Sequence, residues 1–361
     1  MKKLDELFNQ IEFATILTTG RTGSDYLQGC LDNVPGILIF SGHIRFYNFC
    51  DQKKINIINY KDLPQVLELF IKENSHLFYK NIIENRQIDL NIFEFKKNFF
   101  KIVEEKNLER KKFLFAVYLS YHLTLGRNVE NIKTMVHHSH TIKETKRFLK
   151  DFQNSKLLIT IRDPRANLKS GITNWIKYDR TKESEQHFYF YLKRIREDLL
   201  YAQNQTNKKF FLKLEDANKI ETKKNLLSFL KVQFNNQVMT ATFAGKIWPG
   251  DKLSRFSSIK GEYNKSVLNN NWNDFFNKKD KLILNLIYKD YTKFGYEIEN
   301  INLLKKIYIF FLIPIPFSYE KIIFSIKYNL IDKISIKTKM KNVFFYSIKT
   351  LYLYKLLFKF N

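Results

Sequence analysis

One short segment places anion-binding residue types between an apolar run and a helical pattern. Residues 18–24 read TTGRTGS and follow the apolar run 13–17. Gly20 and Gly23 allow the backbone to approach a ligand closely. A helix that begins near Ser24 would direct its free N–H groups and the positive end of its dipole at an anion, and Arg21 adds a positive charge. The segment therefore predicts a site for a phosphate or a similar group.

A second segment has the same character. Residues 157–161 form a continuous apolar run, Arg162 follows it, and Pro164 ends the strand ahead of an expected helix. Ser170 stands eight residues after Arg162. A guanidinium fork and a hydroxyl at this spacing suit a second phosphate.

The P-loop of nucleotide triphosphatases is the competing interpretation of the first segment. That loop needs Gly, four residues, then Gly-Lys-Ser/Thr, so that Lys reaches the phosphates and the hydroxyl binds magnesium. Gly20 and Gly23 are three apart, and Ser24 follows Gly23 with no Lys between them. A divergent P-loop nucleotide-dependent kinase stays open as an alternative.

Together, in this order and each after its own strand, the two segments resemble the sulfotransferases that use 3′-phosphoadenosine 5′-phosphosulfate, with the bacterial, carbohydrate-type branch favoured. The resemblance runs from about residue 13 to residue 296 and implies this nucleotide as the sulfuryl donor, with no metal. It implies that Arg21 takes the place of the family's Lys beside the bridging oxygen of the phosphosulfate. It also implies that Thr22, Gly23 and Ser24 form a loop around the 5′-phosphosulfate. The same resemblance implies that Tyr26 lies near the adenine and that Arg162 and Ser170 hold the 3′-phosphate.

The transfer needs a base, because an acceptor hydroxyl attacks sulfur more readily as its proton is removed. His140 follows the expected strand 133–137 and precedes Arg162 by 22 residues, the spacing at which the family has its catalytic His. His138 stands where the family has a Lys. His43, after the expected strand 37–40, is the second candidate, because some carbohydrate-directed members use an acidic residue or a His in this loop.

A third element lies late in the chain. Arg255, Lys260 and Gly261 precede Trp272, and the family often closes its nucleotide site with a basic loop of this kind. A basic surface loop in a very basic chain is the competing interpretation.

The order of the elements predicts an α/β fold. Five expected strands alternate with helical patterns and predict a P-loop-like parallel sheet of about five strands flanked by helices; they are 13–17, 37–40, 133–137, 156–161 and 210–214. The stretch 42–132 is too long for a simple crossover and predicts a helical insertion over the acceptor side. We expect an α/β domain over residues 1–300 and a basic amphipathic C-terminal extension over residues 301–361.

Charge and composition restrict the partners. The net charge of +25 is compatible with nucleic acid, but no nucleic-acid motif accompanies it, so we expect no nucleic-acid partner. A non-catalytic basic protein that binds nucleic acid or membrane remains the second alternative. Two cysteines and an N-terminus without a secretory signal favour the cytoplasm.

The last 61 residues differ from the rest in character. They have a net charge of +9, interleaved with aromatic and aliphatic residues, and no apolar run long enough to span a bilayer. Two interpretations stay open: a peripheral segment on an anionic membrane surface, or a tail packed on the domain. The expected activity is sulfuryl transfer to a hydroxyl, with a sugar of a surface polysaccharide or glycolipid as the favoured acceptor.

Overall fold

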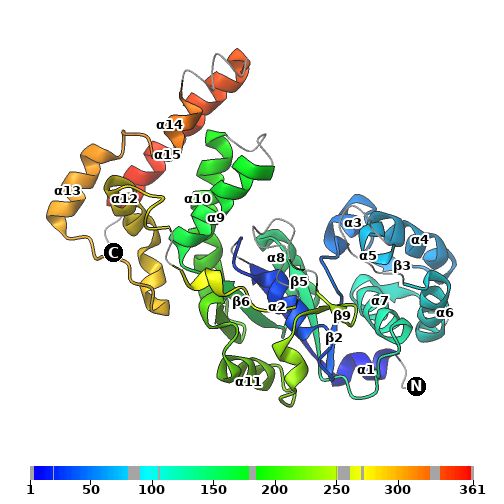
Figure 1. The fold of residues 1–361 in the computed structure, drawn as a ribbon. Helices are drawn as coiled ribbons and strands as arrows, with labels where there is room; N and C mark the ends of the chain where they lie inside the picture. Colours follow the sequence, from blue (N-terminus) through cyan, green and yellow to red (C-terminus); the bar gives the residue numbers. More distant parts are fainter. Residues whose placement is uncertain are drawn as a thin grey trace. The chain divides into compact units, whose positions relative to one another are not determined.

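The computed structural model describes residues 4–18, 20–79, 90–104, 106–178, 184–248, 250, 261–269, 272–325 and 334–358 (Figure 1). The chain forms two compact units. The sheet unit comprises residues 1–18, 23–160 and 205–265, and the helical unit comprises residues 19–22, 161–204 and 266–361.

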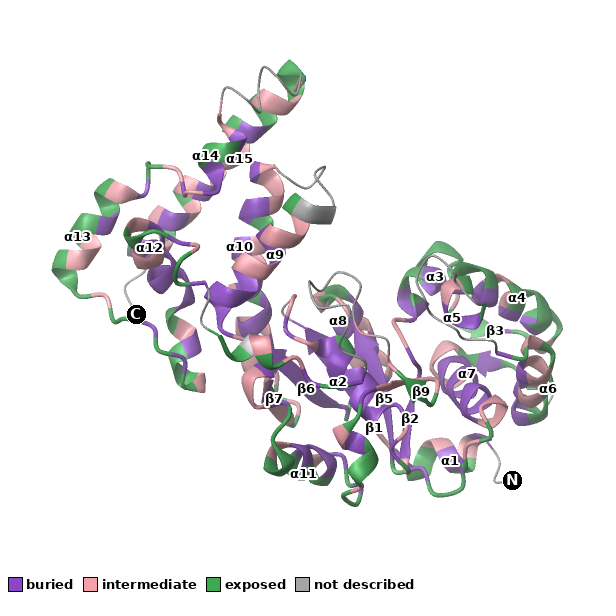
Figure 2. Cartoon of the chain, viewed as in Figure 1, coloured by how far each residue is buried: buried purple, intermediate pink, exposed green. Residues whose placement is uncertain are grey.

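The sheet unit is built on a five-stranded sheet in the order β2-β5-β1-β6-β7. The strands are β1 (Glu12–Thr18), β2 (Ile37–Ile39), β5 (Thr134–Ser139), β6 (Lys156–Ile161) and β7 (Lys209–Lys213). Strand β1 pairs in parallel with β5 and with β6, and β2 pairs in parallel with β5. Every residue of β2, β5 and β6 is buried, as expected of parallel strands covered on both faces (Figure 2). The predicted α/β fold with a parallel sheet is confirmed.

The sheet register brings three strand ends to one edge. Leu17 of β1 lies opposite Ser139 of β5, and Thr18 lies opposite Thr160 of β6. Strands β2 and β5 lie on one side of β1, and β6 and β7 lie on the other side. The connections therefore change direction between β1 and β6, which makes a topological switch point. Ligands of open α/β sheets bind outside the carboxyl ends of the strands at such a point. The predicted anion loop follows β1, His140 follows β5, and Arg162 follows β6.

Helices surround this sheet and fill the long stretch between β2 and β5. Helices of the sheet unit outside that stretch are α1 (Leu4–Gln10), α2 (Ser24–Leu31), α8 (Ile142–Asp151) and α11 (Ile220–Phe229). The stretch itself contains α3 (Phe46–Gln52), α4 (Leu63–Glu73), α5 (Ser75–Phe78), α6 (Ile92–Val103) and α7 (Arg110–Thr124), with a short antiparallel pair, β3 (Ile57–Ile58) and β4 (Leu108–Glu109). Aromatic side chains such as Phe46, Phe70, Phe99 and Phe113 form a buried cluster there.

The helical unit is built from α9 (Pro164–Tyr178), α10 (Glu185–Asn204), α12 (Lys278–Tyr288), α13 (Leu303–Leu312), α14 (Glu320–Ile323) and α15 (Ile336–Phe358). Helix α15 packs on α10, where Asn342 accepts a hydrogen bond from the Glu185 backbone N–H. Lys349 is buried between the carboxylates of Glu185 and Glu320. The sequence-predicted boundary near residue 300 stays a prediction.

The C-terminal helices also present apolar side chains to solvent. Leu304 and Phe311 of α13 are 75% and 68% exposed, and Met340 and Leu351 of α15 are each 68% exposed. Figure 2 shows this mixture of exposed and intermediate residues along α13. No helix within the described ranges combines the length and the apolar character needed to cross a membrane.

Candidate active site

The loop after β1 turns sharply before α2 begins. Gly20 and Gly23 have φ values of +101° and +79°, a region that favours glycine. The Thr22 N–H donates to the Gly20 carbonyl oxygen at 2.8 Å, and Gly23 is the N-cap of α2. Ser24 starts the helix, as the sequence predicts. Gly20, Arg21 and Thr22 belong to the helical unit, and Gly23 and Ser24 belong to the sheet unit.

Two side chains of the helical unit hold the backbone of this loop. The Arg21 N–H donates to Asn167 Oδ1 at 3.2 Å and to Tyr191 Oη at 3.4 Å. The Tyr191 hydroxyl in turn donates to Asn167 Oδ1 at 2.7 Å. Asn167 lies on α9 and is fully buried, whereas Tyr191 lies on α10. A bonded group of three residues from three segments therefore fixes the position of Arg21.

Positive charge gathers around Tyr191. Burial raises the pKa of this hydroxyl, while the backbone and the charge of Arg21 and the charges of Arg194 and Arg162 lower it. Arg21 and Arg162 thus lie close enough to one side chain to act on it electrostatically. Both arginines that sequence patterns assign to phosphates belong to the helical unit, and both act on the Tyr191 hydroxyl through their charge.

Asp163 and Arg165, at the start of helix α9, form an ion pair. Asp163 accepts two side-chain hydrogen bonds from Arg165, at 3.0 and 2.7 Å, and one from its backbone N–H at 2.9 Å. The Arg165 guanidinium also stacks over the Trp272 ring at 3.9 Å. These contacts fix the start of the helix. The candidate anion ligand Arg162 lies just before this start, and the second candidate, Ser170, lies two turns later and is partly buried.

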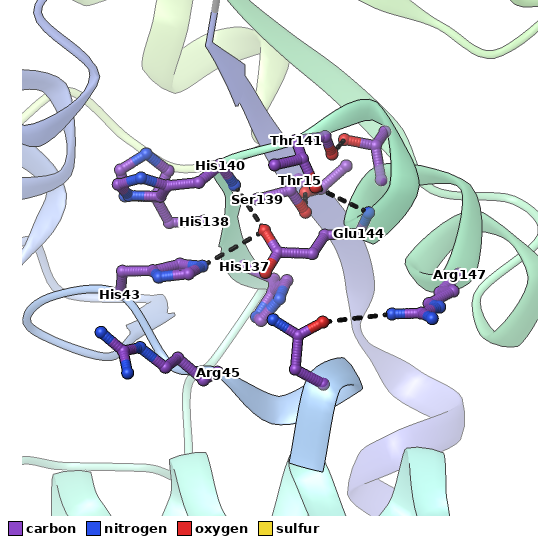
Figure 3. A network of polar contacts seen from close by, with 12 residues as sticks. Thr15, His43, Arg45, His137, His138, Ser139, His140, Thr141, Glu144 and Arg147 are labelled. Carbon is purple, nitrogen blue, oxygen red and sulfur yellow. Dashed lines mark hydrogen bonds and ion pairs between the residues drawn. The ribbon is translucent and has the colours of Figure 1, made fainter. Parts of the chain in front are cut away.

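In the sheet unit, two histidines meet at one carboxylate (Figure 3). His43 Nε2 lies 3.3 Å from Glu144 Oε2, and the same oxygen accepts a hydrogen bond from the His140 backbone N–H at 2.8 Å. The rings of His43 and His140 are 3.9 Å apart between centroids. Both histidines that the sequence singles out as candidate bases therefore belong to one cluster.

Glu144 is the residue that organises this cluster. Burial would raise its pKa, but hydrogen bonds from His43 and the His140 backbone and the charge of His43 outweigh this effect and lower it. The Glu144 N–H donates to Thr141 Oγ1 at 3.2 Å, which caps α8. An ionised carboxylate held in this way orients the imidazole of His43 and fixes the strand end from which His140 projects.

His138 and His137 are neighbours with different environments. His138 Nδ1 lies 2.8 Å from Gln28 Oε1, and its ring is 4.4 Å from that of His140. Burial, followed by the charges of His140 and His43, holds the pKa of His138 well below its ordinary value. His137 points into the core instead, bonded to the Tyr118 hydroxyl at 2.9 Å, and burial lowers its pKa to about 3.

A small surface hollow of about 30 Å³ adjoins these residues within the sheet unit. Asp25, Gln28 and Ser41 contribute polar groups to it, and Phe243 and Trp248 contribute aromatic rings. Gln28 and Asp25 also contact His138, so the hollow and the histidine cluster share two residues.

The remaining predicted site residues lie elsewhere or outside the described part. Tyr26 is buried on α2 against Trp248 and Tyr263, with Lys223 5.0 Å above its ring. Gly261 is described: its N–H donates to the Trp248 carbonyl oxygen at 2.8 Å, and its own carbonyl accepts from the Ala241 N–H. Arg255 and Lys260 lie outside the described residues. The roles expected for these four residues stay predictions.

Asn167, Tyr191, Glu144 and Gln28 are the site residues that the sequence patterns did not single out. A signal for Glu144 existed, because Thr141-x-x-Glu144 matches the capping-box pattern at a helix start. Gly171, inside the pattern of α9, signalled a close approach by another group, which is the Tyr191 ring. Gln28 and Asn167 had no comparable signal.

No family model and no curated protein matches the chain. Among solved structures, the sulfotransferase domain of the Synechococcus PCC 7002 olefin synthase is similar at 12% identity and a TM-score of 0.46, over 80% of this chain and 97% of that one. The sulfotransferase domain of the curacin biosynthetic pathway is similar at 13% identity and a TM-score of 0.46, over 80% and 100%. A sulfotransferase from Mycobacterium avium is similar at 10% identity and a TM-score of 0.34, over 65% and 68%. At this level of similarity, function has to be argued from the residues of the chain itself.

Proposed function

We propose that this chain is a sulfotransferase that moves a sulfuryl group from 3′-phosphoadenosine 5′-phosphosulfate to an acceptor hydroxyl. The observation that supports this most strongly is that Asn167 and Tyr191 hold the backbone of Arg21, while the charges of Arg21 and Arg162 both act on Tyr191. The two arginines follow the neighbouring parallel strands β1 and β6 at a switch point. A nucleotide with phosphates at two positions suits two arginines at two strand ends.

In this proposal the donor is held by the loop after β1 and the start of α9. Residues 22–24 surround the 5′-phosphosulfate with backbone N–H groups, and Arg21 stabilises the charge that develops on the leaving phosphate. Arg162 and Ser170 hold the 3′-phosphate through a charged fork and a hydroxyl. These donors act without a metal ion, so transfer is expected to persist when divalent cations are chelated.

The acceptor side uses the histidine cluster. The acceptor oxygen forms a bond to sulfur while the bond between sulfur and the bridging phosphate oxygen breaks, and the acceptor proton passes to His140. Glu144 orients the cluster through His43 and the His140 backbone. His43 is the alternative base, since it shares the same carboxylate.

A sugar is the acceptor class that suits the surface beside the cluster. A sugar ring has an apolar C–H face, which packs on aromatic side chains such as Trp248 and Phe243, and a rim of hydroxyls. Asp25, beside the same rings, has an exposed carboxylate that can accept a hydrogen bond from such a hydroxyl. This supports a polysaccharide or glycolipid acceptor.

The direct test is an assay of transfer from labelled donor to a panel of sugars, run with a metal chelator. We expect release of adenosine 3′,5′-bisphosphate that depends on the acceptor. Phosphoryl transfer from ATP that requires magnesium, with no sulfuryl transfer, would support the kinase alternative instead.

We further propose that α13 and α15 dock on an anionic membrane surface from the cytoplasmic side. Exposed apolar residues of these helices, including Leu304 and Phe311, accompany a net charge of +9 over residues 301–361. Apolar burial and polybasic attraction together give peripheral binding that weakens with salt.

Co-sedimentation with vesicles containing phosphatidylserine tests this docking. Leu304→Asp with Phe311→Asp should abolish sedimentation at low salt, whereas Ile57→Asp, at a position 67% exposed in the sheet unit, should not. A wild-type protein that stays in the supernatant at low salt would show that the lysines are ordinary surface charge.

A further inference from the structure

A carboxylate and two imidazoles gather in the sheet unit in a pattern that sulfuryl transfer does not require. One oxygen of Asp25 and one ring nitrogen each of His138 and His140 lie within 4.8 Å of one another. Asp25 lies in the first turn of α2 beside the expected anion loop, where a negative charge complements the helix dipole but works against binding a phosphosulfate.

The hydrogen bonds of Gln28 define the state of the His138 ring. The Gln28 amide nitrogen donates to the carbonyl oxygens of Phe40 and Gly42, at 2.6 and 2.8 Å, so the amide oxygen must face His138. That oxygen lies 2.8 Å from Nδ1, which accordingly carries the ring proton. Nε2 is left with its lone pair.

This lone pair is buried and unused. His138 is 2% exposed, and its Nε2 atom has no hydrogen-bond partner among the described residues. A buried acceptor without a partner costs about 1–3 kcal/mol. An imidazole whose other N–H is anchored to a fixed oxygen is the arrangement that metal-ligating histidines have.

We propose that Asp25, His138 and His140 bind one divalent transition-metal ion of the zinc type. Two imidazoles and a carboxylate suit Zn²⁺ and Co²⁺ and disfavour Mg²⁺ and Ca²⁺, which prefer oxygen ligands. Bonds of about 2.1 Å in a tetrahedral site place ligand atoms roughly 3.4 Å apart. Asp25 Oδ1 lies 3.8 Å from His138 Nδ1, so the Asp25 side chain has to rotate toward Nε2 to complete the site. Asp25, whose side chain is 53% exposed, has room for such a rotation.

The metal has a consequence for the transfer, which rests on the proposed function. A metal on His140 takes the lone pair that accepts the acceptor proton, so Zn²⁺ inhibits sulfuryl transfer rather than supporting it. The metal site itself does not depend on the nature of the reaction.

Metal binding is measured first, on full-length protein stripped with a chelator and dialysed. We expect Zn²⁺ to bind at one equivalent in calorimetry, and Co²⁺ to give the intense visible absorption of a tetrahedral site. Asp25→Asn keeps the side-chain shape, and His138→Asn keeps a donor to Gln28 while removing Nε2. Each variant should weaken Zn²⁺ binding beyond the roughly 10–100-fold cost of losing an outer-shell partner. His187→Ala, in the helical unit, is the matched control and should bind Zn²⁺ as the wild type does.

The outcomes separate this inference from the proposed function. Wild-type protein that binds no Zn²⁺ at about 100-fold excess, or a thermally stable Asp25→Asn variant that binds it unchanged, overturns the metal site. Zn²⁺ binding in a protein without transferase activity supports the site and removes the proposed function. In an active protein, inhibition by Zn²⁺ that Asp25→Asn relieves supports both.

Discussion

Gly171 gives the sharpest test of how the anion loop is held. It lies inside α9, where Ala would ordinarily stabilise a helix by about 0.5–1 kcal/mol relative to Gly. A Cβ atom at this position would lie 2.4 Å from Cε1 and 2.8 Å from Cζ of Tyr191. Gly171→Ala therefore forces the Tyr191 ring to move.

The ring has little space on its other side. A Cβ at Gly20 would lie 2.9 Å from Tyr191 Oη, so the ring fills the space between two glycines. Overpacking of this kind costs about 1–3 kcal/mol, which exceeds the gain in helix propensity. We expect Gly171→Ala to lower the free energy of unfolding by about 1–2 kcal/mol.

Movement of the Tyr191 ring should also weaken nucleotide binding. Displacing the ring lengthens the 2.7 Å bond from Tyr191 to Asn167 and the contacts of the Arg21 N–H. If about 1.4–2.8 kcal/mol of binding depends on this geometry, affinity for adenosine 3′,5′-bisphosphate falls about 10- to 100-fold.

Thermal unfolding and calorimetry measure the two effects. Adding Tyr191→Leu to Gly171→Ala should restore stability, because the clash is removed, but not affinity, because the hydroxyl is lost. Ile176→Ala, on an exposed position of the same helix, is the control for the substitution itself. A Gly171→Ala protein with wild-type stability and wild-type nucleotide affinity would refute the role given to Tyr191.

Three further predictions concern the base and the buried charges. His140→Ala should slow transfer about 10²- to 10⁴-fold at unchanged nucleotide affinity; a larger loss in His43→Ala, with His140→Ala active, would move the base to the earlier loop. Lys349→Met leaves the buried carboxylates of Glu185 and Glu320 without their cation and should lower unfolding free energy by about 3–5 kcal/mol, recovered in part when both become Gln; a melt unchanged from wild type contradicts this. Burial raises the pKa of Asp198 to about 6, against an ordinary value of 3.8. The stability that the protonated carboxyl contributes to the fold is therefore fully present below about pH 4 and is lost as pH rises through 6. Relative to wild type, Asp198→Asn should therefore gain at most about 3 kcal/mol of unfolding free energy between pH 4 and pH 7, as measured by denaturant titrations. An unfolding free energy that changes with pH equally in both proteins would contradict the raised pKa of Asp198.

The strands were predictable because their apolar runs are local signals. The runs 13–17, 37–40, 156–161 and 210–214 each fall within one or two residues of a strand. The run 133–137 identified β5, although that strand continues to Ser139. The strand order, with β1 between β5 and β6, depends on pairings across more than a hundred residues and has no local signal.

From the sequence, candidate site residues could be proposed only where the expected function dictates a residue type at a fixed spacing. Arg21, Arg162 and His140 belong to such patterns. Tyr191 and Asn167 were not found, because they act through one backbone N–H and through shape, and many residue types have that capacity. Gln28 orients His138 through two backbone carbonyls that only the folded chain brings within reach.

The central claim is that the helical unit recognises a nucleotide with two separate phosphate positions. Calorimetry of full-length protein with adenosine 3′,5′-bisphosphate, adenosine 5′-monophosphate and ATP, with and without magnesium, tests it most directly. We predict that the bisphosphate binds without magnesium and at least about tenfold more tightly than the monophosphate, and that Arg162→Ala removes this preference at a cost of about 1.5–3 kcal/mol. Equal affinity for the bisphosphate and the monophosphate, or tight binding only of ATP with magnesium, would contradict the proposed function.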